Sequence, residues 1–393
     1  MVNRVPIGVV INPFAKSNIR NGDREHSVRQ IVGDLGLVRL THRPEDLADV
    51  MREFIEKGVL HVVYMGGDGT AQVGMTAMIK EVKALYPEGV SSDELLYFPY
   101  VHPANAGTIN FTAKLAQING TPEENLERLV FACERGVAFE TFPLQTLKII
   151  TYDKNDPSTI LGEEYGFVFG DGGVTNFLEK YYGNGDSVET AKFVWQMLSF
   201  VGRHAEDFVT GTQFVTKRLD KLVDQTAYEI DRPGVIKALR IIGKGLTSFA
   251  ARTNFHRSLL RPKNAKVTID GEELPYTQFN ALGAGSLAIN SIGIKPFYRL
   301  PSRNDAGNLH VYAADLSYGG LIWTFLKGWS GRYNFNFERG VEKLAQHMRL
   351  ETTVPGRYTL DAELKNHSTV IEISRGPKLL VPMIYGDLPS LEY

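Results

Sequence analysis

The sequence predicts two domains: an α/β domain on a parallel sheet over residues 1–138, and a mostly antiparallel β domain over residues 139–393. Three observations lead to this prediction. The chain has 393 residues, more than twice the usual domain length of about 150 residues. Up to about residue 135, short β-branched runs alternate with stretches of helical period. Beyond about residue 138, runs that alternate between polar and apolar residues are separated by turns rich in Gly, Asn and Asp.

The first domain is expected to begin with a buried strand, Ile7 to Ile11, that ends at Asn12-Pro13. Helices and strands follow in alternation at residues 28–35, 37–41, 47–55 and 60–65. Such a succession gives right-handed crossovers and a parallel sheet with helices on both faces. Ligands of these sheets bind at the carboxyl ends of the strands. The turns that start at Asn12, Thr41 and Gly66 should therefore converge on one crevice.

The second domain is predicted from strand-like runs at residues 146–152, 166–169, 265–269 and 309–313. A helix-rich segment at about 181–262 interrupts them.

Composition excludes several classes of protein. Hydrophobic residues make up 43% and charged residues 22% of the chain, which argues against a disordered chain and a coiled coil. Lys and Arg number 43 against 45 Asp and Glu, so nucleic acid is not an expected partner. A single cysteine, Cys133, excludes an internal disulfide framework. No apolar run reaches the roughly 18 residues of a membrane-spanning helix, and we expect a cytoplasmic protein that meets a membrane only from its surface.

A glycine-rich turn is the most informative motif of the sequence. It follows the strand at 60–65 and contains Gly66, Gly67, Asp68, Gly69 and Thr70. Glycines let a polyanion approach backbone N–H groups, and the N-terminus of a following helix attracts negative charge. This chemistry suits phosphate, although a plain strand-to-helix turn has a similar composition. The spacing matches neither a Walker A loop nor GxGxxG.

A second turn follows the apolar run at 95–101 and contains Gly107, Thr108 and Asn110. It suits a nucleotide, and it equally suits a helix N-cap made by Thr108 or Asn110.

Together these residues resemble the diacylglycerol kinase catalytic-domain superfamily, which includes bacterial lipid kinases and sphingosine kinases. GGDGT at 66–70 is similar to the family signature, Asn12-Pro13 to its NPxSG loop, and 107–113 to its GTxNxxA segment. Thr41 stands where a nucleotide-contacting threonine is expected. LDAE at 360–363 resembles the DGE-type turn of the second domain. The resemblance covers nearly the whole chain and implies a first domain like that of NAD kinases and phosphofructokinases.

The resemblance implies an ATP-dependent lipid kinase that acts on diacylglycerol or a long-chain base. Asp361 would be the general base, with Glu363 behind it, and Asp68 would bind ATP through Mg²⁺ or orient its phosphates. The nucleotide-binding residues would be Asn12, Thr41, Gly66, Gly67, Asp68, Gly69, Thr70, Gly107, Thr108 and Asn110. Phosphoryl transfer to an alcohol needs a phosphate cradle, a cation and a proton acceptor, and each has a candidate here.

Several positions depart from the family pattern. Phe14-Ala15 follows Asn-Pro, so the loop lacks its Ser-Gly; no glutamate occurs at 71–74, and Ala362 turns DGE into DAE. The family has a Mg²⁺ site near a DDGxL turn; here Asp305 is the one carboxylate left in that turn, and it remains a candidate ligand. A second DGE at 270–272 is predicted to be a hairpin turn, because Asp-Gly between alternating runs is a strong hairpin signal.

Two alternatives stay open. GGDGT also occurs in NAD kinases, although the Asn-Glu dipeptide of that family is absent here. The departures also fit a catalytically weak protein that binds a lipid or a nucleotide on the same scaffold.

The segment 232–266 carries nine Lys or Arg residues and neither Asp nor Glu. Its basic and apolar residues follow helical spacing on two sides, which predicts peripheral contact with an anionic membrane. An ordinary amphipathic helix on the β domain has the same pattern. The sequence does not define the role of residues 204–260, the lipid acceptor or the oligomeric state.

Overall fold

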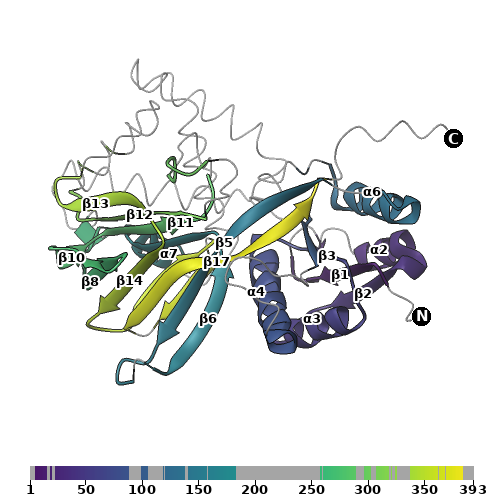
Figure 1. Ribbon diagram of the computed structural model, residues 1–393, viewed down its shortest axis with the longest axis horizontal. Helices are drawn as coiled ribbons and strands as arrows, with labels where there is room; N and C mark the ends of the chain where they lie inside the picture. The colour runs from purple at the N-terminus through teal and green to yellow at the C-terminus, as the bar shows by residue number, and fades with distance from the viewer. Residues whose placement is uncertain are drawn as a thin grey trace, which may run out of the picture.

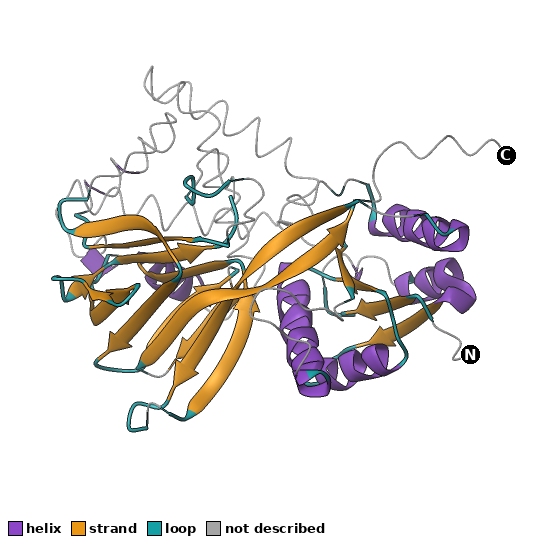
Figure 2. Ribbon diagram, in the orientation of Figure 1, coloured by secondary structure: helices purple, strands orange, loops and turns teal. Residues whose placement is uncertain are grey.

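The structure is a computed structural model, viewed as a ribbon in Figure 1. It describes residues 5–15, 18–19, 23–87, 99–104, 118, 120–137, 140–156, 158–182, 257–258, 260–288, 296–301, 307–317, 320, 324, 337–361, 363–367 and 369–383. Helices gather around the first sheet, and strands dominate the rest of the described chain, as Figure 2 shows. The predicted combination of an α/β domain and an antiparallel β domain is confirmed.

The first domain is built on a parallel sheet with the strand order β2-β1-β3-β4. Its strands are β1 (Ile7–Ile11), β2 (Gly36–Leu40), β3 (His61–Met65) and β4 (Tyr100–Pro103). Every residue of β1 and β3 is buried. This explains why both strands are continuous apolar runs, as is usual for strands covered on both faces.

Helices cover the two faces of this sheet: α2 (Arg24–Val32), α3 (Asp46–Glu56), α4 (Asp68–Leu85) and α6 (Pro122–Arg135). Alternate side chains of β1 (Ile7, Val9 and Ile11) pack against α2 and α6, whereas Val10 packs toward α3 and α4. The alternation of side chains along a strand produces this division. The helix expected at 28–35 ends at Val32, and a short 3₁₀ turn, η1 (Gly33–Leu35), follows, because Gly33 adopts a φ of +49°.

The second domain consists of two antiparallel sheets. One has the order β10-β8-β14-β17-β5-β6, with β9 paired to β8. Its strands are β5 (Thr141–Tyr152), β6 (Ile160–Gly166), β8 (Lys263–Ile269), β9 (Glu272–Glu273), β10 (Gln278–Phe279), β14 (His347–Thr352) and β17 (Val370–Pro382).

The other sheet has the order β13-β12-β11-β7-β15-β16. Its strands are β7 (Val168–Gly172), β11 (Ala281–Gly285), β12 (Leu309–Ala314), β13 (Gly340–Ala345), β15 (Gly356–Leu360) and β16 (Glu363–His367). A buried core joins the sheets, with Val267 and Ile371 from one and Val311 and Leu360 from the other.

The strand expected at 166–169 is divided in two. β6 ends at Gly166 and β7 begins at Val168, so the chain changes sheets at Phe167. Helix α7 (Gly173–Tyr182) follows β7. The rest of the helix-rich segment expected at about 181–262 lies outside the described residues, apart from a few positions at its end.

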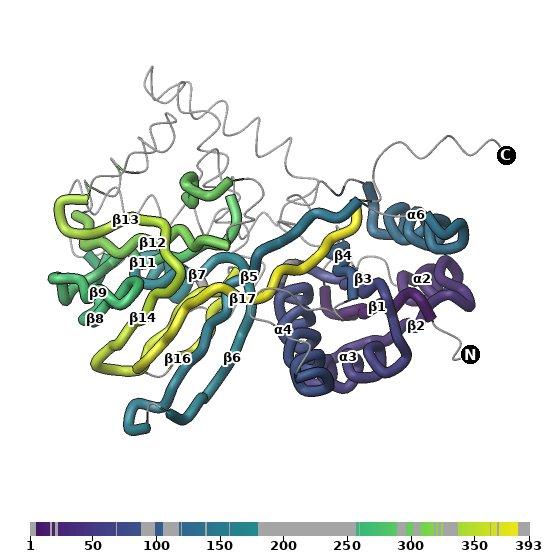
Figure 3. Tube along the Cα trace, viewed as in Figure 1, coloured from purple at the N-terminus to yellow at the C-terminus, as the bar shows by residue number. Residues whose placement is uncertain are grey.

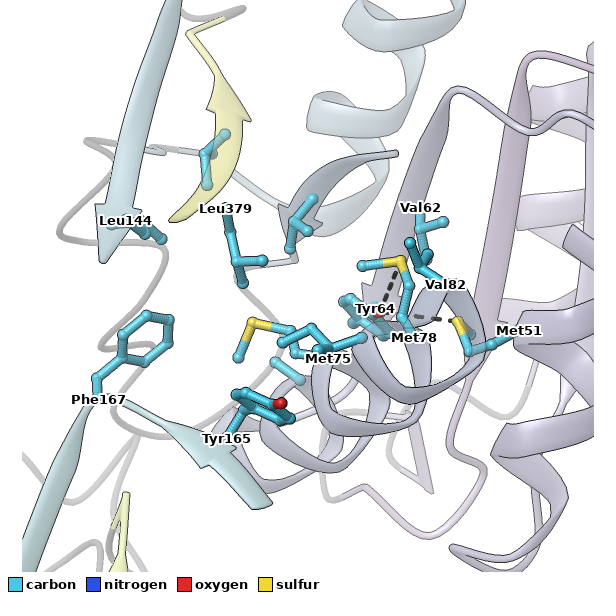
Figure 4. Packing of buried hydrophobic residues seen from close by; sticks show 14 of the residues in the cluster. Met51, Val62, Tyr64, Met75, Met78, Val82, Leu144, Tyr165, Phe167 and Leu379 are labelled. Atoms are coloured by element: carbon cyan, nitrogen blue, oxygen red, sulfur yellow. Dashed lines mark hydrogen bonds between the residues drawn. The ribbon is translucent and has the colours of Figure 1, made fainter. Parts of the chain in front are cut away.

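Strands β5 and β17 connect the two domains. They pair from Thr141↔Pro382 to Tyr152↔Val370, and Figures 1 and 3 show this long ribbon running from the β domain to the first domain, where β17 packs beside β4. Their ends, which include Leu144 and Leu379, enter the same core cluster as Tyr64 of β3 and Met75 of α4 (Figure 4). One hydrophobic core therefore spans both domains.

Within the described part of the chain, no helix combines the length and the apolar character that crossing a bilayer requires.

Candidate active site

The turns at the carboxyl edge of the parallel sheet meet where sequence analysis placed them. The side-chain amide of Asn12, after β1, donates a hydrogen bond from Nδ2 to the Thr70 hydroxyl at 3.0 Å. Thr41, after β2, is buried, and its backbone N–H donates to the carbonyl of Ile11 at 3.0 Å. The strand order changes direction at β1, and ligands of such sheets bind at this point.

The glycine-rich turn leads directly into α4. Gly67 precedes the helix in an extended conformation, and no side chain caps the helix N-terminus. A Cβ atom on Gly66 would lie 2.4 Å from the Thr70 hydroxyl oxygen, so any side chain there would displace the group that Asn12 holds. The first N–H groups of α4 therefore belong to a helix end that favours an anion. The side chain of Asp68 is not among those that the structure describes.

A carboxylate from the second domain reaches this turn. Glu363 begins β16, and a Cβ atom on Gly69 would lie only 2.6 Å from Glu363 Oε1. A side chain at position 69 would therefore have to displace the carboxylate of Glu363. The β15–β16 hairpin and the glycine-rich turn, which lie far apart in the sequence, are brought into contact.

Asp361 lies in the turn of the same hairpin. Its backbone adopts a φ of +50°, a conformation that aspartate tolerates better than most residues. Its carboxylate accepts hydrogen bonds from the N–H groups of Phe167 at 2.9 Å and Val168 at 2.8 Å. A Cβ atom on Gly166 would lie 2.6 Å from Asp361 Oδ2, so glycine leaves room for the carboxylate. These contacts fix Asp361 at the corner between β6 and β7.

Asp270 has nearly the same local geometry in a different place. Its φ is +51°, and its Oδ1 accepts hydrogen bonds from the N–H groups of Gln346 and His347, both at 2.9 Å. It forms the Asp-Gly turn between β8 and β9, so the hairpin expected at 270–272 is confirmed. Asp361 and Asp270 therefore share a local geometry, but Asp361 lies in the hairpin that contacts the glycine-rich turn and Asp270 lies in the β8–β9 turn.

Helix α4 is hydrogen-bonded to strand β6 of the second domain. Gln72 donates from Nε2 to the carbonyl of Tyr165 at 2.9 Å. The Thr76 hydroxyl donates to the same carbonyl and accepts from the Tyr165 N–H, each at 3.1 Å. All these groups are buried. We call this set of contacts between Gln72, Thr76 and Tyr165 the α4–β6 latch.

An ion pair extends the latch toward the other end of α4. Lys83 donates to Glu163 Oε1 at 2.9 Å, and the Tyr165 hydroxyl contacts both side chains. Burial alone would raise the pKa of Glu163, but hydrogen bonds from Lys83 and Tyr165 lower it below its usual value. Burial and the nearby Glu163 raise the pKa of Tyr165. The ion pair therefore joins the two domains at the C-terminal end of α4.

A second network supports Asn12. Asn18 is buried and donates to the carbonyls of Asn12 at 2.7 Å and Met65 at 2.9 Å. Arg24 donates to Asn18 Oδ1 at 2.6 Å and to Glu123 at 2.8 Å. Sequence reasoning missed Asn18 and Arg24, as it missed the latch, because no motif marks residues that meet only in the folded chain.

Other predicted residues fall outside the described part of the chain, namely Gly107, Thr108, Asn110, Asp305 and Ala362. Most of the basic segment 232–266 does too. Its described lysines Lys263 and Lys266 lie in β8 and pair with Asp171 and Glu273. Among the described residues, no group of three or more His, Cys, Asp or Glu side chains is arranged to hold a metal ion.

Comparison with known proteins gives a family match for the first domain. Residues 6–139 match the family model of the diacylglycerol kinase catalytic domain. A crystal structure of a diacylglycerol kinase from Bacillus anthracis str. Sterne aligns with a TM-score of 0.53 at 14% identity, over 98% of this chain and 99% of that one. A yeast NADH kinase complexed with NADH aligns with a TM-score of 0.42 at 10% identity, over 96% and 84% of the two chains. No curated protein matches the sequence significantly.

Proposed function

Because residues 6–139 match the family model of the diacylglycerol kinase catalytic domain, we propose that the protein is an ATP-dependent kinase acting on a lipid hydroxyl. Diacylglycerol or a long-chain base would be the acceptor. One observation carries the proposal. The hairpin that holds Asp361 and Glu363 lies directly against the glycine-rich turn, with Glu363 over Gly69. A phosphate cradle of the first domain and a carboxylate of the second, Glu363, are thus adjacent, with Asp361 in the same hairpin, and phosphoryl transfer requires such a combination.

The glycine-rich turn would hold the phosphates of ATP. The uncapped N-terminus of α4 would supply backbone N–H donors and partial positive charge, and Gly66 and Gly67 would let the phosphates approach the main chain. Asn12, which is bonded to Thr70, would fix the edge of this cradle.

Mg²⁺ is consistent with these residues. The Glu363 carboxylate, which lies beside Gly69, would repel a polyphosphate unless a cation lay between them. Mg²⁺ is typically bound by one or two carboxylates together with substrate phosphates. We expect Glu363 and Asp68 to hold the ion. When bound, Mg²⁺ would supply charge that offsets the phosphate oxygens.

Asp361 would accept the proton of the lipid hydroxyl. Its hydrogen bonds to the backbone of Phe167 and Val168 hold the carboxylate in one orientation, as a general base requires. The basic segment 232–266 would hold the enzyme on an anionic membrane that contains the lipid.

The test supplies ATP labelled on its γ-phosphate together with a total lipid extract. We expect a labelled lipid. The charge of a general base contributes roughly 100-fold or more to the rate, so Asp361→Asn should lower kcat at least about 100-fold. Asp270→Asn is the matched control, because it removes the same charge from a turn of the same geometry, and it should keep most of the activity.

Three results would contradict the proposal. A reversed effect of the two variants would show that Asp361 is not the base. Labelling of NAD in a parallel reaction, without labelled lipid, would favour the NAD kinase-like alternative. ATP binding with no transfer to any acceptor would favour a catalytically weak lipid- or nucleotide-binding protein.

A further inference from the structure

A large aromatic side chain stands exposed at the ligand-binding edge of the parallel sheet. Phe14 is 65% exposed, although aromatic residues of this size usually bury much of their surface. Its backbone N–H donates to Asn12 Oδ1 at 2.9 Å, and the same Asn12 amide donates to Thr70. Asn12 therefore ties the position of Phe14 to the glycine-rich turn.

A second ring stands beside it. The rings of Phe14 and His42 lie 5.8 Å apart between centroids with an interplanar angle of 70°, which is a favourable edge-to-face arrangement. His42 is also exposed, and its backbone N–H donates to Asp46 at the start of α3 at 3.2 Å. The two rings are steeply inclined and so do not stack face to face.

The strand order shows on which side of the glycine-rich turn the rings of Phe14 and His42 lie. The glycine-rich turn follows β3, Phe14 follows β1 and His42 follows β2, and these strands are neighbours in the order β2-β1-β3. Neighbouring strands lie about 4.8 Å apart, so the path from β3 to β2 along the sheet edge is about 10 Å. A nucleotide with its phosphates at the turn would extend along this path and bring its base to the rings.

We propose that Phe14, braced by its edge-to-face contact with His42, is the platform on which the base of the bound nucleotide stacks. This inference rests on the proposed function, because it assumes that the glycine-rich turn binds the phosphates of the same ligand. Phe14 stands at the unspecified position of the NPxSG pattern, so the platform belongs to this chain's own sequence. Stacking accepts any flat base, and purines, with the larger ring system, should bind more tightly than pyrimidines.

The test compares two ligands that share the polyphosphate and differ in the base. Titration calorimetry of the full chain measures the Kd of Mg-ATP and of Mg-tripolyphosphate. Stacking of a base on an aromatic side chain corresponds to a loss of roughly fivefold or more in affinity on alanine substitution. We expect Phe14→Ala to raise the Kd of ATP by at least about fivefold and to leave that of tripolyphosphate unchanged. Phe14→Trp should retain the affinity for ATP.

Ile19→Ala is the matched control, because Ile19 is equally exposed at 65% and lies close by in the sequence. It should change neither Kd, and an effect equal to that of Phe14→Ala would overturn aromatic stacking. Binding to vesicles of phosphatidylglycerol and phosphatidylcholine is measured in parallel. If Phe14→Ala weakens vesicle binding and leaves ATP binding unchanged, Phe14 is a membrane contact and the inference is wrong.

The outcomes separate this inference from the proposed function. A wild-type protein that binds neither ATP nor tripolyphosphate contradicts both. A wild-type protein that binds both ligands, with no change in ATP affinity on Phe14→Ala, contradicts the base platform and leaves the phosphate site standing.

Discussion

Gly69 and Glu363 meet with no space for a methyl group between them. Alanine at position 69 suits a helix better than glycine by about 1 kcal/mol, and the atom it would strike is the end of a flexible side chain. We therefore expect Gly69→Ala to leave the melting temperature nearly unchanged but to move the carboxylate of Glu363. Kinase activity should fall by about tenfold, an effect equivalent to about 1.4 kcal/mol.

A double-mutant cycle with Glu363→Gln checks this cause. If Gly69→Ala acts by displacing Glu363, the two substitutions should be clearly non-additive in kcat/KM. Additive effects would show that Gly69 matters for another reason.

At the level of single residues, sequence could locate turns but not their neighbours. The Asp-Gly hairpin at 270 followed from its own composition, and the glycine-rich turn followed from its place after a strand. The contact between Gly69 and Glu363 did not, because it depends on how two domains pack. For the same reason Gln72 attracted attention only as a departure from a pattern, whereas its buried amide bonds the backbone of Tyr165.

The α4–β6 latch connects the glycine-rich helix to the corner that holds Asp361. Thr76→Val keeps the shape of the side chain and removes both hydrogen bonds to Tyr165. The Tyr165 carbonyl keeps its bond from Gln72, but the buried Tyr165 N–H loses the hydroxyl as its acceptor, which should lower the free energy of unfolding by about 1–3 kcal/mol. Because Phe167, two residues beyond Tyr165, binds Asp361, kcat should fall while the KM for ATP stays constant.

Thr76→Ser is the control for the latch, since it keeps the hydroxyl, and it should retain most of the kcat. Equal losses of kcat in the valine and serine variants would mean that the methyl packing of Thr76, and not its hydrogen bonds, is what matters.

The neighbouring strands β3 and β4 carry a buried pair of histidines. His61 Nδ1 and His102 Nε2 lie 3.0 Å apart. Burial lowers the pKa of His61 to about 4, and burial together with the nearby His61 lowers the pKa of His102 well below its usual value. In the unfolded chain both should titrate near the ordinary value of about 6.5. Protons therefore bind the unfolded state preferentially as the pH falls below that value.

The stability that depends on these neutral histidines is thus complete above about pH 6.5 and declines as the pH falls toward 4. Each histidine should contribute a slope of up to about 1.4 kcal/mol per pH unit. Urea unfolding at several pH values measures this slope, and His61→Gln should reduce it by about one histidine's share. An unchanged slope in this variant would contradict the assignment.

Strands and helices were predicted best where the pattern is continuous and local. The buried runs of β1 and β3 and the helix at 47–55 needed only their own periodicity. The corner at Phe167 was missed because an apolar run does not show where the chain passes from one sheet to another. That corner proved important, since its backbone holds Asp361.

Across the whole molecule, the core shared by the two domains makes a specific prediction. Leu379 of β17 is fully buried in the cluster that contains Tyr64 and Met75. Leu379→Ala should lower the free energy of unfolding by about 2–5 kcal/mol. It should also reduce the hydrogen-exchange protection of β3 and α4, because these elements lose part of their cover.

Leu380 is the adjacent control, with 40% of its surface exposed. Leu380→Ala should cost less than about 1 kcal/mol. If Leu379→Ala left protection in β3 and α4 unchanged, the two domains would be energetically independent.

The path of β17 has a consequence for biosynthesis. Val62, Tyr64 and the inner face of α4 are translated long before Leu379 and Val381, which complete their hydrophobic surroundings. Until those residues leave the ribosome, the nascent α/β half should present an uncovered apolar surface, the kind of surface that chaperones bind. We expect its cooperative folding to wait for the closure of the β5–β17 ribbon.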